Sequence, residues 1–174
     1  MKNQKMQQRL SKEVVEFINS RKSLQLSTVS KDGRPYASYA PFALGDECLY
    51  ILISEIAVHA TNLQHNPKAS ILIIQDEDSA DELFARIRVN YSVDAELIDV
   101  DSLQWHAGLA VLTSRHGERI NNLSQLSDFK LFKLKPSGGR FVKGFGRAYT
   151  LAGGTLAGEI VSHMSDGHKK RDVA

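Results

Sequence analysis

The 174-residue sequence contains little cysteine and few aromatic residues. Its single cysteine, Cys48, excludes an internal disulfide and a zinc site built from several cysteines. Its longest apolar runs, such as residues 49–53, are far shorter than the ~20 residues that span a bilayer. Its first ten residues are polar and lack the apolar segment of a signal peptide. We therefore expect a soluble cytoplasmic protein that does not engage a membrane.

The sequence also lacks a strong excess of charge of one sign. It has 22 Lys and Arg against 20 Asp and Glu, a net charge of +2, which is too small to indicate a nucleic-acid partner. Apolar residues make up 42% and charged residues 24%, as in ordinary globular proteins. A chain of this length can bury roughly two thirds of its unfolded surface, so one domain with its own core is expected.

Common catalytic motifs are absent as well. The sequence has no Gly-x-Ser-x-Gly nucleophile elbow, no His-Glu-x-x-His pair and no phosphate-binding Gly-Lys-Ser loop. Cys48 lies within an apolar run, which is typical of an inert core thiol. No motif therefore supports hydrolase chemistry.

Two hydrophobic periodicities are present. Apolar residues recur at helical spacing from Met6 to Ile18, which predicts an amphipathic first helix. From Leu24 the pattern alternates, with turn signals at residues 31–33 and 45–46, so the first three strands are expected to form an antiparallel meander. Strands are predicted at 24–29, 36–42, 48–53, 69–74, 83–97, 129–134 and 140–151, and further helices at 57–66, 102–115 and 120–126. A turn at residues 136–139 is expected to separate the last two strands.

Hairpin turns rather than regular βαβ alternation favour a mostly antiparallel β-barrel with peripheral helices. We expect one barrel domain over residues 1–152, including the first helix. Residues 153–174 are expected to form a polar, weakly patterned C-terminal tail.

Three groups of residues could carry chemistry. Arg86 and Arg88 share one face of a predicted strand and either meet solvent or bind an anionic ligand. Small Gly144 and Gly146 line one face of the last predicted strand, which permits close approach of another strand or of a flat ligand. In the tail, His168 is followed by Lys169 and Lys170. This histidine is either a solvated residue or an axial ligand to haem iron, with the lysines pairing with haem propionates.

A series of collinear motifs resembles the bacterial haem-utilisation proteins of the HutZ/HugZ family, above all the shorter, HutZ-type members. The first six motifs are Leu24-Gln25-Leu26-Ser27-Thr28-Val29, Asp32-Gly33-Arg34-Pro35, Ser38-Tyr39-Ala40-Pro41-Phe42, Leu52-Ile53-Ser54, His59-Ala60-x-Asn62-Leu63 and Asn66-Pro67. The remaining four are Phe84-Ala85-Arg86-x-Arg88, Leu123-Ser124-Gln125-Leu126-x-Asp128-Phe129, Phe141-Val142-Lys143-Gly144-Phe145-Gly146 and Gly167-His168-Lys169-Lys170. The likeness extends from about Arg9 to Lys170, and its specificity comes from the number and order of the motifs.

The resemblance implies an FMN-binding-type split β-barrel of the pyridoxamine-phosphate-oxidase-like superfamily, assembled as a homodimer with haem near the interface. It implies oxidative degradation of haem to a biliverdin-type product, with release of iron and with electrons from an external donor. His168 matches the family's axial iron ligand. Asp128 matches an aspartate that hydrogen-bonds this histidine across the dimer, and Arg88 matches an arginine near the distal side of the haem.

Asp128 and Arg88 are thus the expected catalytic residues. Arg86, Lys143, Lys169 and Lys170 join His168 as the expected cofactor-binding residues. The spacing between residues 153 and 166 departs from the family pattern, which affects the geometry of the contact between His168 and Asp128.

Two other functions remain open. The protein could carry or store haem through His168 without degrading it, and loss of the haem band on adding a reductant separates catalysis from storage. It could instead be a flavin-dependent split-barrel oxidoreductase in which Arg86, Arg88 and Lys143 hold the phosphate of FMN. A yellow purified protein would indicate this flavin function.

Overall fold

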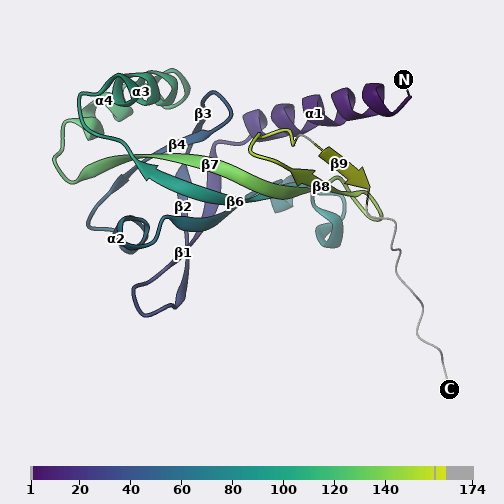
Figure 1. Ribbon diagram of the computed structural model, residues 1–174, viewed down its shortest axis with the longest axis horizontal. Coiled ribbons are helices and arrows are strands. Elements are labelled where there is room, and N and C mark those ends of the chain that lie inside the picture. The colour runs from purple at the N-terminus through teal and green to yellow at the C-terminus, as the bar shows by residue number, and fades with distance from the viewer. Residues whose placement is uncertain (1, 159, 164–174) are drawn as a thin grey trace.

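A curled antiparallel sheet forms the body of the protein in the computed structural model, which describes residues 2–158 and 160–163 (Figure 1). Seven strands follow the order β2-β1-β5-β6-β7-β4-β3, and β8 and β9 extend the sheet from β7. The strands are β1 (Ser23–Val29), β2 (Pro35–Pro41), β3 (Ala43–Leu44), β4 (Leu49–Ser54), β5 (Lys68–Ile74), β6 (Arg88–Leu97), β7 (Phe129–Val142), β8 (Ala148–Ala152) and β9 (Ile160–His163). The helices are α1 (Lys2–Ser20), α2 (Val58–His65), α3 (Leu103–His116) and α4 (Arg119–Ser124), with short 3-10 turns at Glu77–Ser79 and Leu83–Ala85.

This architecture confirms the predicted mostly antiparallel barrel with peripheral helices. The predicted first helix is α1, and its Leu10, Val14 and Ile18 are buried. Among residues 2–158 and 160–163, no helix is long and apolar enough to span a membrane.

The continuous apolar run of β4 is explained by burial on both faces. Ile51 and Ile53 point into the main core inside the curled sheet. Tyr50 and Leu52 point the other way, into a second apolar cluster completed by residues of α3 such as Trp105. A strand covered on both sides does not alternate between apolar and polar residues, so its pattern differs from that of β1.

The expected meander of the first three strands is only partly correct. The β1–β2 hairpin is confirmed, with Val29 opposite Pro35. However, β4 does not pair with β2. It pairs along its whole length with β7, from Leu49 opposite Leu134 to Ser54 opposite Phe129. Turn signals fix local hairpins, but the partner of a strand is set by long-range packing that no local pattern encodes.

The position of the turn before β8 also differs from the prediction. Residues 136–139 do not form a turn, because β7 continues through them with an irregularity opposite Tyr91 and Val93. The chain turns instead at residues 144–147, where the N–H of Lys143 donates to the carbonyl of Arg147 at 2.9 Å. Gly144 and Gly146 have φ of 147° and 66°, so these glycines serve the turn and do not line a strand face. The expected strand at 83–97 begins only at Arg88.

After β8, residues 153–158 return to the barrel and bury Leu156 in the main core. The Glu47 carboxylate accepts the N–H of Leu156 at 2.8 Å, and the buried Tyr91 hydroxyl donates to its carbonyl. Strand β9 then pairs with β8, with His163 opposite Tyr149. We call residues 153–158 together with β9 the C-terminal arm. These contacts fix the arm at the end of β7 that carries Val142.

We predict that Leu156→Ala lowers the free energy of unfolding by about 2–4 kcal/mol, because it removes a buried side chain and leaves a cavity. Urea denaturation measures this change. The matched control is Leu103→Ala, whose side chain is 89% exposed and whose loss should change stability by less than about 0.5 kcal/mol. Equal effects of the two substitutions would contradict the anchoring of the arm.

Candidate functional site

The predicted site residues fall at the two opposite ends of β7. Arg88 lies opposite Val142 at one end, and Lys143 follows directly. Asp128 precedes Phe129 at the other end. Because β7 has 14 residues, the two ends are separated by about 40 Å. The structure therefore brings Arg86, Arg88 and Lys143 together and keeps Asp128 apart from them.

At the arginine end, the turn between β5 and β6 is held by Arg86. Its Nε donates to the carbonyl of Gln75 at 2.8 Å, and its Nη2 donates to the same oxygen. Arg88 in turn donates from Nη1 to the carbonyl of Arg86 at 3.0 Å. Within the described part of the chain this is the hydrogen bond that Arg88 makes, so its Nε and Nη2 can serve a ligand.

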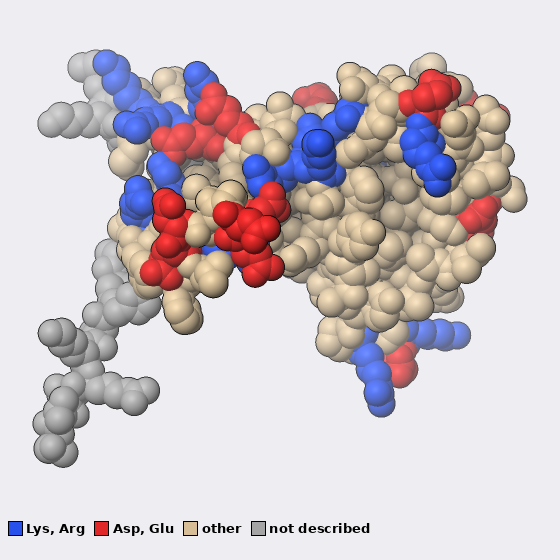
Figure 2. Space-filling view, turned by 180° about the vertical axis from the view of Figure 1, so that it is seen from behind, with Lys and Arg blue, Asp and Glu red and all other residues tan. Residues whose placement is uncertain are grey.

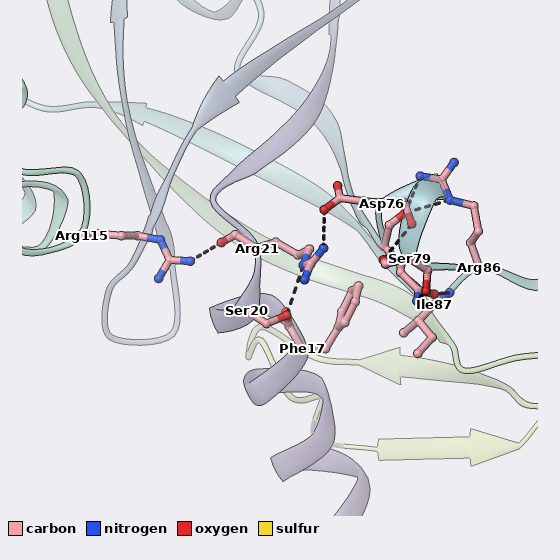
Figure 3. A network of polar contacts seen from close by, with 9 residues as sticks. Phe17, Ser20, Arg21, Asp76, Ser79, Arg86, Ile87 and Arg115 are labelled. Atoms are coloured by element: carbon pink, nitrogen blue, oxygen red, sulfur yellow. Dashed lines mark hydrogen bonds and ion pairs between the residues drawn. The ribbon is translucent and has the colours of Figure 1, made fainter. Parts of the chain in front are cut away.

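A cleft of about 860 Å³ opens beside this turn. The half-buried Leu72 and Ile74 contribute apolar side chains to its lining. Its rim carries charges of both signs, from Arg21, Lys22, Arg86, Asp76, Glu77 and Asp78. Figure 3 shows Arg21 between Ser20 and Asp76, and its Nη1 lies 2.9 Å from the Asp76 carboxylate. The volume lies within the range of ~300–1,000 Å³ that ligand pockets occupy.

Lys143 is engaged inside the protein. Its ammonium forms an ion pair with Glu13 of α1, and both side chains are about three quarters buried, with 23% and 25% exposed. The hydrogen bond from Lys143 lowers the pKa of Glu13 below its usual value, so the Glu13 carboxylate is ionised at neutral pH. The pair ties α1 to the end of β7. A cofactor-binding role for Lys143 stays a prediction.

At the other end of β7, the turn between β4 and α2 holds Asp128. Ser54 Oγ donates to Asp128 Oδ2 at 2.6 Å, and the N–H of Glu55 donates to the Asp128 carbonyl at 2.7 Å. Two exposed apolar residues lie near this pair in sequence: Ile56, two residues after Ser54, is 86% exposed, and Leu126, two residues before Asp128, is 48% exposed. Ser54 belongs to the Leu52-Ile53-Ser54 motif, but the sequence pattern assigns it no role, because its hydrogen-bond partner Asp128 is 74 residues away in the chain.

A second polar pair missed from the sequence joins β2 to α2. His59 Nδ1 lies 2.9 Å from Ser38 Oγ. Burial lowers the pKa of His59, so its imidazole is neutral at pH 7. No carboxylate of the described residues hydrogen-bonds this histidine, so the pair does not form a catalytic triad.

Part of the described outer face of the sheet carries no charged side chain, and Lys68, Arg88, Asp94 and Arg140 border it on the same face. Figure 2 shows a broad area without Lys, Arg, Asp or Glu over β1 and β2, next to the charged region at the left of the view. The strand register places eight uncharged residues side by side on this face: Gln25, Ser27, Ala37, Tyr39, Ser70, Leu72, Asn90 and Ser92. We call this set the uncharged face.

His168, Lys169 and Lys170 lie outside the described residues. The nearest described residue is His163, whose Nε2 donates to the carbonyl of Gly146 at 2.8 Å and whose ring packs against Tyr149. Within residues 2–158 and 160–163, no group of three His, Cys, Asp or Glu side chains could hold a metal ion.

Comparisons with known proteins agree with this fold. Residues 10–143 match the pyridoxamine 5'-phosphate oxidase family. A protein from Vibrio cholerae serotype O1 named heme oxygenase HutZ is 46% identical over 170 residues, which cover 98% of this chain and 96% of that protein.

Two solved structures of such proteins are similar as well. The crystal structure of Vibrio cholerae HutZ, described as a heme storage protein, has 46% identity and a TM-score of 0.74 over 78% of this chain and 96% of that chain. Campylobacter jejuni ChuZ has 33% identity and a TM-score of 0.81 over 92% of this chain and 65% of that chain.

The ten collinear motifs, the curled antiparallel sheet and the near full-length match to HutZ all agree. We conclude that this chain belongs to the HutZ family of pyridoxamine 5'-phosphate oxidase-like split-barrel proteins.

Proposed function

We propose that this protein binds haem at a site shared by two copies of the chain and degrades it oxidatively to a biliverdin-type product, releasing iron. The observation that carries the proposal is the 46% identity to heme oxygenase HutZ over nearly the whole chain. The cleft beside Arg86 has the volume of a ligand pocket, and its half-buried Leu72 and Ile74 would meet an apolar part of such a ligand.

The reach of the chain supports a site built from two copies. His168 follows His163 by five residues, so it can lie at most about 18 Å from the end of the arm. Asp128 lies at the far end of β7, about 40 Å from Val142. Asp128 and His168 of the same chain therefore cannot meet. A contact between them requires His168 from one copy and Asp128 from the other.

The uncharged face supports the homodimer that this contact needs. The centres of protein–protein interfaces are depleted of charged residues and enriched in aromatic ones such as Tyr39, which is 68% exposed here. The side chains at positions 27, 37 and 70 are small and leave the sheet flat enough for a second copy to approach.

Each residue has a separate role in the proposed site. Bound haem would be the substrate and would supply the iron that activates dioxygen. His168 would coordinate this iron through one ring nitrogen, and Asp128 of the second copy would accept the N–H of the other. That acceptor would fix the tautomer and raise the donor strength of the imidazole. Arg88 lies at the same end of β7 as the arm, so its unused N–H groups would be available to hydrogen-bond dioxygen or water at the site.

Two alternatives belong to the same fold. The first alternative is that the protein stores haem without degrading it, and its support is that the solved Vibrio cholerae HutZ is described as a heme storage protein. Binding of FMN receives less support, because Lys143 is paired with Glu13 and Arg86 holds the Gln75 carbonyl, which engages two of the groups expected to hold its phosphate.

We predict that haemin titration, followed by Soret absorption, saturates at one haem per chain and that His168→Ala weakens binding at least tenfold. The matched control is His65→Ala, at an exposed histidine of α2, which should bind like the wild type. Wild-type affinity in the His168 variant would exclude this residue as the iron ligand.

We predict that ascorbate in air bleaches the Soret band of the haem complex and releases iron that a ferrous chelator captures. Loss of the Asp128 carboxylate in Asp128→Ala should slow this reaction about 10–100-fold while changing haem affinity less. Asp81→Ala, at an exposed carboxylate, is the control. A wild-type Soret band that survives the reductant would favour storage over degradation.

A further inference from the structure

We infer that Ser54 is the positioning residue for Asp128, and that its hydroxyl aims the carboxylate at the imidazole that coordinates haem. This inference rests on the proposed function, because it concerns how the same site is oriented. Ser54 does not itself touch the haem or the iron in this account; it acts through Asp128.

The hydrogen bond between the two side chains is well defined. Ser54 Oγ lies 2.6 Å from Asp128 Oδ2, within the short range of a hydroxyl that donates to a carboxylate. Ser54 Oγ also accepts the N–H of Ile56 at 3.2 Å, which fixes the oxygen in place. Because a carboxylate oxygen accepts hydrogen bonds, the single hydroxyl proton of Ser54 is directed towards Asp128.

The backbone around Asp128 is fixed by the same turn. The N–H of Glu55 donates to the Asp128 carbonyl at 2.7 Å, so two consecutive residues of the β4–α2 turn bind one aspartate. The Glu55 carboxylate lies 3.6 Å from the Lys130 ammonium, whose positive charge offsets its negative charge. Among the described residues, the bond from Ser54 engages Oδ2, and Oδ1 keeps the capacity to accept a further N–H.

Orientation matters because a hydrogen bond weakens steeply once its angle falls below about 120°. A carboxylate without Ser54 can rotate about its terminal torsion, which is broad and roughly two-fold. Rotation would misalign the bond to the imidazole N–H and lower the donor strength that this bond gives the imidazole. The exposed Ile56 and Leu126 would exclude water once a second copy covers them, which would strengthen the aligned bond.

The iron–histidine stretching frequency of the reduced haem complex, measured by resonance Raman spectroscopy, tests this inference. A weaker hydrogen bond to the axial imidazole lowers this frequency, whereas a purely structural role of Ser54 would leave it unchanged. We expect Ser54→Ala to move the band at least half of the way from the wild-type position to that of Asp128→Asn. Ser54→Thr, which keeps the hydroxyl, should restore the wild-type position.

The matched control is Ser124→Ala, since Ser124 Oγ donates to the Asn121 carbonyl of α4 and makes no bond to Asp128.

Thermal melting checks that each variant is folded, and Ser54→Cys replaces Ser54→Ala if the latter is not. A wild-type band in the folded Ser54 variant beside a shifted band in Asp128→Asn overturns the role of Ser54. An unshifted band in Asp128→Asn overturns this role as well, together with the contact between Asp128 and the ligand. Failure of the proposed haem site gives a different result, because the wild-type protein itself would then show no iron–histidine band.

Discussion

The length of β7 is the constraint on which the rest of this account depends. This strand places Asp128 at one end of the barrel and the C-terminal arm at the other, and a single chain cannot bring the two together. The arm is held in place by the burial of Leu156 and by the contacts of its backbone with Glu47 and Tyr91. The barrel is therefore a rigid spacer, and the proposed chemistry belongs to the space between two copies.

This arrangement explains why the described residues lack the usual features of an enzyme site. Arg86 and Lys143 are satisfied within the chain, Asp128 is paired with Ser54, and the cleft beside Arg86 is open to solvent. Each group is oriented in advance by its neighbours, and Arg88 and Asp128 retain hydrogen-bonding capacity directed outward. Pre-oriented groups of this kind lose little conformational freedom when a ligand binds.

Much of the fold could be predicted from local sequence, because α1 and the β1–β2 hairpin follow from periodicity and turn residues. The pairing of β4 with β7 and the turn at Gly144 and Gly146 could not, since both depend on packing between distant strands. For the site, the motifs pointed to Asp128 and Arg88 but did not reveal that they lie at opposite ends of one strand. Ser54 escaped notice because its role comes from a contact across the sheet.

Complementation between two impaired variants is the most direct test of a site shared by two copies. Chains carrying Asp128→Ala and chains carrying His168→Ala are mixed in equal amounts, unfolded, refolded together and assayed for ascorbate-driven haem loss. A shared site predicts recovery to about a quarter of the wild-type rate per chain, since half of the randomly formed dimers are mixed and each has one complete site of two. A rate no higher than the average of the two parent variants would contradict the account.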